Sequence, residues 1–153
     1  MALRAWSLVA DIGGTNARFG LVDPGSGDLV ERFHYSVKEH AELNGALQHC
    51  LEDIVARGGW EKTPEKACFA VACVVEGERI QFTNSPWFID RTSVTRLLGG
   101  AQLELINDFV AVGLAVGGLE PPEWVQVGGG AGTAGGKRRG IPPRPRGACP
   151  VRK

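Results

Sequence analysis

Two short segments of the sequence combine residue types that could bind a phosphorylated substrate. The first runs from Asp11 to Arg18 and reads Asp-Ile-Gly-Gly-Thr-Asn-Ala-Arg. Its two adjacent glycines leave backbone N–H groups open to an anion, because no Cβ covers them. Thr15 and Asn16 add side-chain donors, and Asp11 could hold a hydrated Mg²⁺ beside the phosphates. The chemistry indicated is the binding of a phosphate chain at a tight turn.

The same segment also fits an ordinary turn between two strands. Gly-Gly pairs are common at turns, so Gly13 and Gly14 taken alone favour a plain turn over a phosphate site. The segment matches neither GxxxxGK[ST] nor GxGxxG, the two common nucleotide-binding motifs. The complete string of eight residues is more specific than its two glycines.

The second segment is Asn107-Asp108, which follows a short apolar run over residues 103–106. Open α/β sheets bind ligands at the carboxyl ends of their strands, so a carboxylate with a polar neighbour there is a candidate site. Asn and Asp are also preferred helix N-caps, and a helix is predicted over residues 109–116. The two roles can coexist.

The elements that must position these segments follow from hydrophobic periodicity and turn residues. The first three predicted strands are joined by short turns, which indicates an antiparallel meander, and helix and strand alternate afterwards, so we expect an α/β fold with a mixed sheet. Residues 67–75 form a continuous apolar run, typical of a strand covered on both faces. Ser36 to Glu39 matches a capping box before the first helix. Strands are predicted over residues 4–10, 18–23, 29–35, 67–75, 79–83 and 103–106, and helices over residues 43–55, 91–98 and 109–116.

Three segments, in order and spacing, resemble the bacterial glucokinase family, which shares its fold with other sugar kinases, actin and Hsp70-type ATPases. Residues 11–18 resemble the first phosphate-binding motif of that fold. Residues 83–87 (Thr-Asn-Ser-Pro-Trp) resemble the Thr-Asn-x-x-Trp loop beside the sugar, and residues 105–111 resemble the Ile-Asn-Asp-Phe segment. The resemblance covers about residues 8–127 and implies a ribonuclease H-like or actin-like ATPase lobe with flanking helices. Cys73 departs from the family, which usually has proline in this strand-end region.

The resemblance also implies a reaction, in which ATP and D-glucose give glucose 6-phosphate and ADP. Asp108 would be the general base for the 6-hydroxyl group of the sugar, and Asn107, Asp108 and Asn84 would bind the sugar. ATP would bind with Mg²⁺ at the first motif. The residues implied for that nucleotide site are Ala10, Asp11, Ile12, Gly13, Gly14, Thr15, Asn16 and Arg18.

The net charge of zero is the sum of two unlike parts. Up to Val127 the chain has 10 basic and 17 acidic residues, whereas residues 128–153 have 7 basic residues, no acidic ones, 8 Gly and 4 Pro. Such a segment cannot bury enough apolar surface to offset its loss of entropy, so we expect a lobe over residues 1–127 and a disordered basic tail over residues 128–153. The tail no longer resembles the family, which indicates a truncated or frameshifted glucokinase of low or no activity.

Composition narrows the other classes of function. No run approaches the ~20 apolar residues that span a bilayer, so no membrane partner is expected. The four cysteines lack CxxC spacing, so we expect neither a zinc site nor a disulfide framework. We therefore expect a cytoplasmic location. The acidic body argues against a specific nucleic-acid partner. Glucose and ATP are the expected partners, and a homodimer is left open. The alternative function is a non-catalytic lobe that senses sugar or phosphate.

Overall fold

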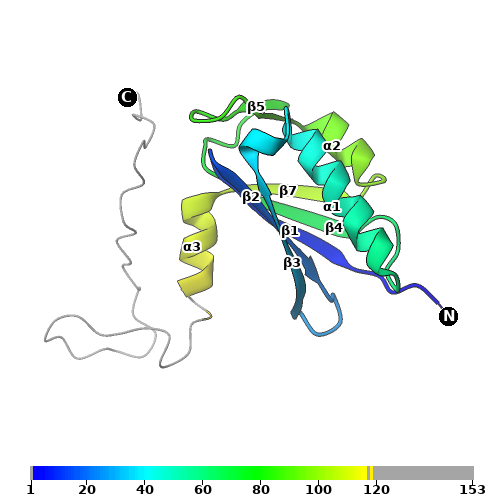
Figure 1. Ribbon diagram of the computed structural model, residues 1–153. Coiled ribbons are helices and arrows are strands. Elements are labelled where there is room, and N and C mark those ends of the chain that lie inside the picture. Colours follow the sequence, from blue (N-terminus) through cyan, green and yellow to red (C-terminus); the bar gives the residue numbers. More distant parts are fainter. Residues whose placement is uncertain (1, 117, 119–153) are drawn as a thin grey trace, which may run out of the picture.

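The computed structural model describes residues 2–116 and 118 (Figure 1). Its main feature is a five-stranded sheet with the strand order β3-β2-β1-β4-β7, and a separate two-stranded sheet pairs β5 with β6. The strands are β1 (Ser7–Ile12), β2 (Asn16–Val22), β3 (Leu29–Ser36), β4 (Lys66–Val71), β5 (Arg79–Gln81), β6 (Phe88–Asp90) and β7 (Gln102–Asn107). The helices are the 3₁₀ helix η1 (Val37–Glu39) and the α-helices α1 (Leu43–Arg57), α2 (Arg91–Leu97) and α3 (Asp108–Val116). The boundary predicted at Val127 and the predicted tail lie outside the described residues.

The sheet is mixed, as the sequence predicts. Strands β1, β2 and β3 form an antiparallel meander, while β1, β4 and β7 run parallel to one another. Parallel neighbours need a crossover connection. Helix α1 lies in the connection from β1 to β4, and α2 lies in the connection from β4 to β7.

One face of the sheet carries the core. Helices α1 and α2 lie on the same side of the sheet (Figure 1). Strand alternation sends Leu8 and Ile12 of β1 to that side, where both are fully buried, whereas Val9 between them is 38% exposed on the other side. The largest fully buried side chains are Trp6, Leu8, Ile12, Phe19, Leu21, Leu43, Leu47, Ile54, Phe69, Trp87, Ile89 and Leu98.

The structure corrects three details of the sequence-based prediction. Strand β4 ends at Val71, and Cys68 in it is only half-buried, so the prediction of a strand covered on both faces is wrong within the described residues. The Ser36 side chain caps η1 by accepting a hydrogen bond from the Lys38 N–H, and α1 starts only at Leu43. Strand β6 was not predicted, because three residues are too few to show a period.

None of the helices in the described part of the chain combines the length and apolarity needed to cross a membrane.

Candidate functional site

The predicted chemical segments meet at one edge of the sheet. The register places Ile12, Val71 and Asn107 in one row at the carboxyl ends of β1, β4 and β7. Adjacent strands lie about 4.8 Å apart, so the turn after β1 and the Asn107-Asp108 pair after β7 are separated by roughly 10 Å at this edge. The two segments therefore lie at the same edge of the sheet, on either side of the end of β4.

The turn after β1 packs directly against the loop between β5 and β6. A Cβ atom on Gly14 would lie 2.8 Å from the main-chain oxygen of Asn84, closer than real Cβ contacts come. A Cβ on Gly13 would meet nothing nearer than 3.7 Å. Neither glycine has a positive φ. Glycine is therefore required at position 14 by the approach of the Asn84 loop, and the first two predicted motifs are in contact.

The turn offers two backbone donors. The N–H of Gly13 donates to the Asn16 carbonyl at 3.0 Å and closes the turn, so it is not available to an anion as the sequence suggested. The Thr15 carbonyl accepts a hydrogen bond of 2.9 Å from the Val37 N–H, which ties the turn to η1. Within residues 2–116, the N–H groups of Gly14 and Thr15 have no hydrogen-bond partner. These two N–H groups and the exposed Thr15 side chain can bind an anion.

The remaining residues of the first motif divide by strand alternation. The side chains of Ala10 and Ile12 point into the core, so only their main chain can line a ligand site. Asp11 lies on the other face and forms an ion pair of 2.9 Å with Arg18, its cross-strand partner. Both side chains are more than half exposed, so the pair contributes at most about 1 kcal/mol. Asn16 is half-buried at the start of β2.

The turn after β1 offers few side-chain ligands for a magnesium ion. Among the described residues, no group of three or more His, Cys, Asp or Glu side chains could hold a metal ion. Mg²⁺ is usually bound by one or two carboxylates together with substrate phosphates and water. Asp11 fits the role of a single carboxylate ligand, in competition with Arg18.

A buried tryptophan, Trp87, anchors the loop that carries Asn84. Trp87 is fully buried, and its indole N–H donates to the His40 carbonyl at 3.0 Å. The backbone N–H of Trp87 donates to Ser85 Oγ at 3.1 Å, and its carbonyl accepts from the Gln81 side chain at 2.9 Å. Trp87 is therefore a packing residue of the core. The side chain of Asn84 stays exposed at the tip of the loop.

Asn107 and Asp108 start α3, as the capping alternative predicts. Asn107 Oδ1 accepts a hydrogen bond of 3.0 Å from the Phe109 N–H, and its Nδ2 donates to the Cys73 carbonyl at 3.1 Å. A main-chain carbonyl is also what proline would supply at position 73, so the departure there leaves this contact intact. Asp108 Oδ1 accepts from the same Phe109 N–H at 2.9 Å. Asp108 is half-buried and, within the described part of the chain, forms no ion pair with Lys or Arg.

A polar cluster behind the Asn84 loop was not predicted from the sequence. The Tyr35 hydroxyl donates to Asp53 Oδ2 at 2.6 Å, and the Tyr35 ring lies 5.6 Å from His40 and 5.2 Å from His49. Burial, followed by the hydrogen bond to Asp53, raises the pKa of Tyr35. Burial also raises the pKa of the Cys50 thiol to about 12. These residues come from β3, the loop before α1, and α1, so no local spacing indicates that they meet.

Comparisons with known proteins point to one family. The sequence profile of the glucokinase family matches residues 8–142. The chain is 43% identical over 131 residues to a glucokinase of Stenotrophomonas maltophilia (strain K279a), an alignment that covers 84% of this chain and 37% of that protein. The chain belongs to the glucokinase family. It spans little more than a third of the length of the curated relatives it matches.

Solved structures of the glucokinase family and of related kinases share the fold. A glucokinase from an Antarctic psychrotroph matches with a TM-score of 0.62 and 31% identity, over 76% of this chain and 36% of that one. The inorganic polyphosphate/ATP-glucomannokinase of Arthrobacter sp. strain KM matches with a TM-score of 0.53 and 26% identity, over 73% of this chain and 47% of that one. The expected actin-like ATPase fold is thereby confirmed for this family member.

Proposed function

We propose that this chain carries the sugar-binding and phosphate-binding edge of an ATP-dependent glucokinase, which transfers the terminal phosphoryl group of ATP to the 6-hydroxyl of D-glucose. The observation that carries the proposal is the meeting of three separate segments at one sheet edge. Gly14 contacts Asn84, and Ile12 and Asn107 lie in the same cross-strand row. Asn84 is exposed and Asn107 is half-buried, and both side chains are polar, so burial of apolar surface does not explain their position at this edge.

In this proposal Asp108 acts as the general base. Its carboxylate accepts the proton of the 6-hydroxyl as that oxygen attacks phosphorus, a role that typically accelerates a reaction by 10²–10⁴-fold. Asn107 holds the start of α3 against the end of β4 and so fixes where the Asp108 carboxylate lies. Asn84 binds the sugar hydroxyls from its anchored loop.

The N–H groups of Gly14 and Thr15 bind the terminal phosphates of the donor. Asp11 would hold Mg²⁺, which neutralises charge on the transferred phosphate when it is bound. The related Arthrobacter kinase is named for both inorganic polyphosphate and ATP. A terminal phosphate is common to both donors, so the described contacts suit either, and the choice of ATP is part of the proposal.

We also propose a cytoplasmic location. Cys50 and Cys68 form no disulfide within the described part of the chain, which suits a reducing compartment.

A chimaeric enzyme tests the proposal. Residues 1–116 of this chain would replace the matching segment of the Stenotrophomonas maltophilia glucokinase, to which the chain is 43% identical. Formation of glucose 6-phosphate would be followed with ATP or with inorganic polyphosphate as donor, and glucose binding by calorimetry. We expect ATP-dependent turnover within about tenfold of that glucokinase.

Other outcomes separate the alternatives. A folded chimaera that binds glucose but transfers no phosphate would support a sensing lobe and contradict the catalytic role. Turnover with polyphosphate alone would correct the donor and leave Asp108 in place. A folded chimaera that neither binds glucose nor transfers phosphate would contradict both the catalytic role and the sensing role of this edge.

A further inference from the structure

The turn after β1 and the loop between β5 and β6 are joined by the short segment of residues 36–40, which contains η1. Near the start of this segment, the Val37 N–H donates to the Thr15 carbonyl at 2.9 Å. At its end, the His40 carbonyl accepts the indole N–H of Trp87 at 3.0 Å. Figure 1 shows the segment, in cyan, beside the hairpin of β5 and β6. A single segment therefore contacts both the proposed phosphate turn and the proposed sugar loop.

The 36–40 segment is held in a fixed shape. Ser36 caps η1 by accepting a backbone N–H of its first turn on Oγ at 3.3 Å. Val37 is buried, and the His40 ring packs edge-on against the Tyr35 ring, with the centroids 5.6 Å apart. A 3₁₀ helix rises about 2 Å per residue, so roughly 6 Å of helix separates the two hydrogen bonds. Movement at one end of so short a helix is passed to the other end.

These contacts close a ring together with the contact between Gly14 and Asn84. The ring runs from the turn to the 36–40 segment, then through Trp87 to the loop, and from the loop back to the turn. Thr15 and Asn84, which are proposed to meet the substrates, are both exposed. Packing over them therefore does not fix their separation, whereas the ring does.

We propose that Trp87 and Ser36 are positioning residues for phosphoryl transfer, an inference that rests on the proposed function. Trp87 fixes the sugar loop to the 36–40 segment, and Ser36 keeps that segment in its helical shape. Together they set the distance between the sugar and the donor phosphate. Phosphoryl transfer depends on holding the attacking oxygen in line with phosphorus, and a misplacement of about 1 Å can cost 10²-fold in rate.

Removal of the Trp87 hydrogen bond tests this role, and Trp6 supplies a matched control. Both side chains are fully buried, and each donates its indole N–H to a main-chain carbonyl, at 3.0 Å to His40 and at 2.8 Å to Glu61. Trp6 precedes β1, so it lies about 20 Å from the carboxyl end of that strand. Trp87→Phe and Trp6→Phe should therefore lower the melting temperature by similar amounts, because each change removes the same kind of contact.

Steady-state kinetics of the chimaeric enzyme distinguish the two variants. Trp87→Phe should lower kcat at saturating glucose and ATP by about tenfold, because both substrates bind but are misaligned. Trp6→Phe should change kcat by less than about twofold, because it lies at the opposite end of β1. A merely structural role would move the two melting temperatures and leave both kcat values alike.

Ser36 provides a second variant that leaves the buried core intact. Ser36→Ala removes the cap of η1 and should lower kcat by about threefold, while Ser36→Thr keeps a hydroxyl group and should restore the parental value. When Ser36→Ala is added to Trp87→Phe, kcat should fall little further, because both changes break the same path.

Amide hydrogen exchange in the full 153-residue chain measures the connection without any activity. Trp87→Phe should speed exchange of the Val37 N–H, the donor to Thr15, by about tenfold, because the far end of the segment is released. Trp6→Phe should leave that exchange rate unchanged.

Three results would overturn the positioning role in an active chimaera. They are equal kcat values for Trp87→Phe and Trp6→Phe, fully additive losses for Trp87→Phe and Ser36→Ala, and an unchanged exchange rate at Val37 in Trp87→Phe. A chimaera without turnover before any substitution would instead overturn the proposed function, and the positioning role with it.

Discussion

The two faces of the five-stranded sheet are made of alternate residues of the same strands, yet they differ in how deeply their side chains are buried. On the face under α1 and α2, Leu8, Ile12 and Phe69 are fully buried. On the opposite face, Val9 is 38% exposed and the Asp11–Arg18 ion pair stands in solvent. The first face is closed by helices within the described residues, whereas the second face and the carboxyl edge leave polar and apolar groups accessible.

This difference indicates that the side chains that stabilise the fold and the candidate functional side chains lie on different sides of the sheet. Removing a group under the helices creates a cavity, which costs stability. Changing a group at the carboxyl edge or on the opposite face of the sheet should cost less stability, because little packs against it within the described residues. Four predictions sharpen or break this separation.

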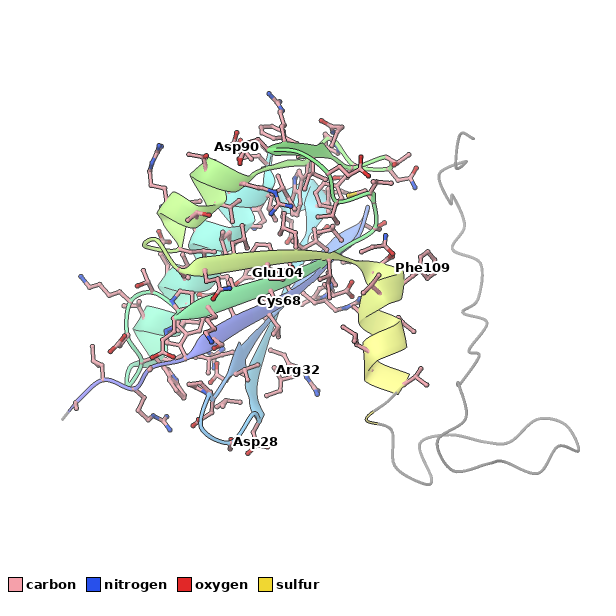
Figure 2. The ribbon with its side chains drawn as sticks, turned by 180° about the vertical axis from the view of Figure 1, so that it is seen from behind. Asp28, Arg32, Cys68, Asp90, Glu104 and Phe109 are labelled. Carbon is pink, nitrogen blue, oxygen red and sulfur yellow. The ribbon has the colours of Figure 1, made fainter. Side chains whose placement is uncertain are left out.

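The largest effect is expected at the carboxyl edge. In the chimaeric enzyme, Asp108→Asn should lower kcat by 100-fold or more, because the amide cannot accept the hydroxyl proton. Glucose binding and the melting temperature should change little. Steady-state assays and calorimetry would measure both, with Asp28→Asn, in the distant turn before β3, as the control (Figure 2). A kcat near the parental value would remove Asp108 from the mechanism.

Substitutions at two adjacent residues of β1 allow the stability contributions of the two faces to be compared directly. In the 153-residue chain, Leu8→Ala should lower the free energy of unfolding by about 2–5 kcal/mol, because Leu8 is fully buried under the helices. Val9→Ala should cost less than about 1 kcal/mol, since Val9 is partly exposed. Urea unfolding of the two variants measures both losses. Equal losses would show that the face of the sheet that carries Val9 is packed as tightly as the face under the helices.

Gly13 and Gly14 can show whether glycine is needed here for close packing against Asn84 or for the conformation of the turn. Gly14→Ala should cost about 1–3 kcal/mol and weaken glucose binding at least tenfold, because the new methyl group displaces the Asn84 main chain. Gly13→Ala should be nearly neutral, since its Cβ has space and its φ is not positive. Calorimetry of glucose binding and thermal unfolding of both chimaeras test this. Similar losses in the two variants would contradict the contact between Gly14 and Asn84.

The smallest expected effect is the pH dependence of stability that arises from buried groups on the face covered by the helices. The pKa of Cys50 is about 12 in the folded chain, against an ordinary value of 9.0, so the folded state holds its proton more tightly. Stability is then complete below pH 9 and falls as the pH rises from 9 towards 12, by up to about 1.4 kcal/mol per pH unit. Tyr35, whose pKa is also raised, adds to the loss above pH 10.

Urea unfolding between pH 8 and pH 11 measures this slope. Cys50→Ala should flatten it between pH 9 and pH 10, because the alanine has no proton to lose. An unchanged slope in that variant would assign the alkaline loss to other groups.

Much of the architecture was predictable because it depends on local signals. The apolar periodicity of residues 43–55 predicted α1, which runs from Leu43 to Arg57 in the structure. The short turns among the first three strands predicted the meander. The hairpin of β5 and β6 was half missed, because its strands are three residues long and are held by Trp87, whose partner His40 lies far away in the sequence.

The sequence by itself determined which residues are candidates for the chemistry, because the order of the three motifs and their residue types are properties of the chain. It also determined that Asn107 could cap a helix, a local hydrogen bond that the structure contains. Only the tertiary structure decided that Gly14 rather than Gly13 must be glycine, and that Tyr35, His40, His49 and Asp53 form one cluster. The physical reason is that close approach and burial arise between residues distant in sequence, whereas propensity and periodicity act over a few neighbours.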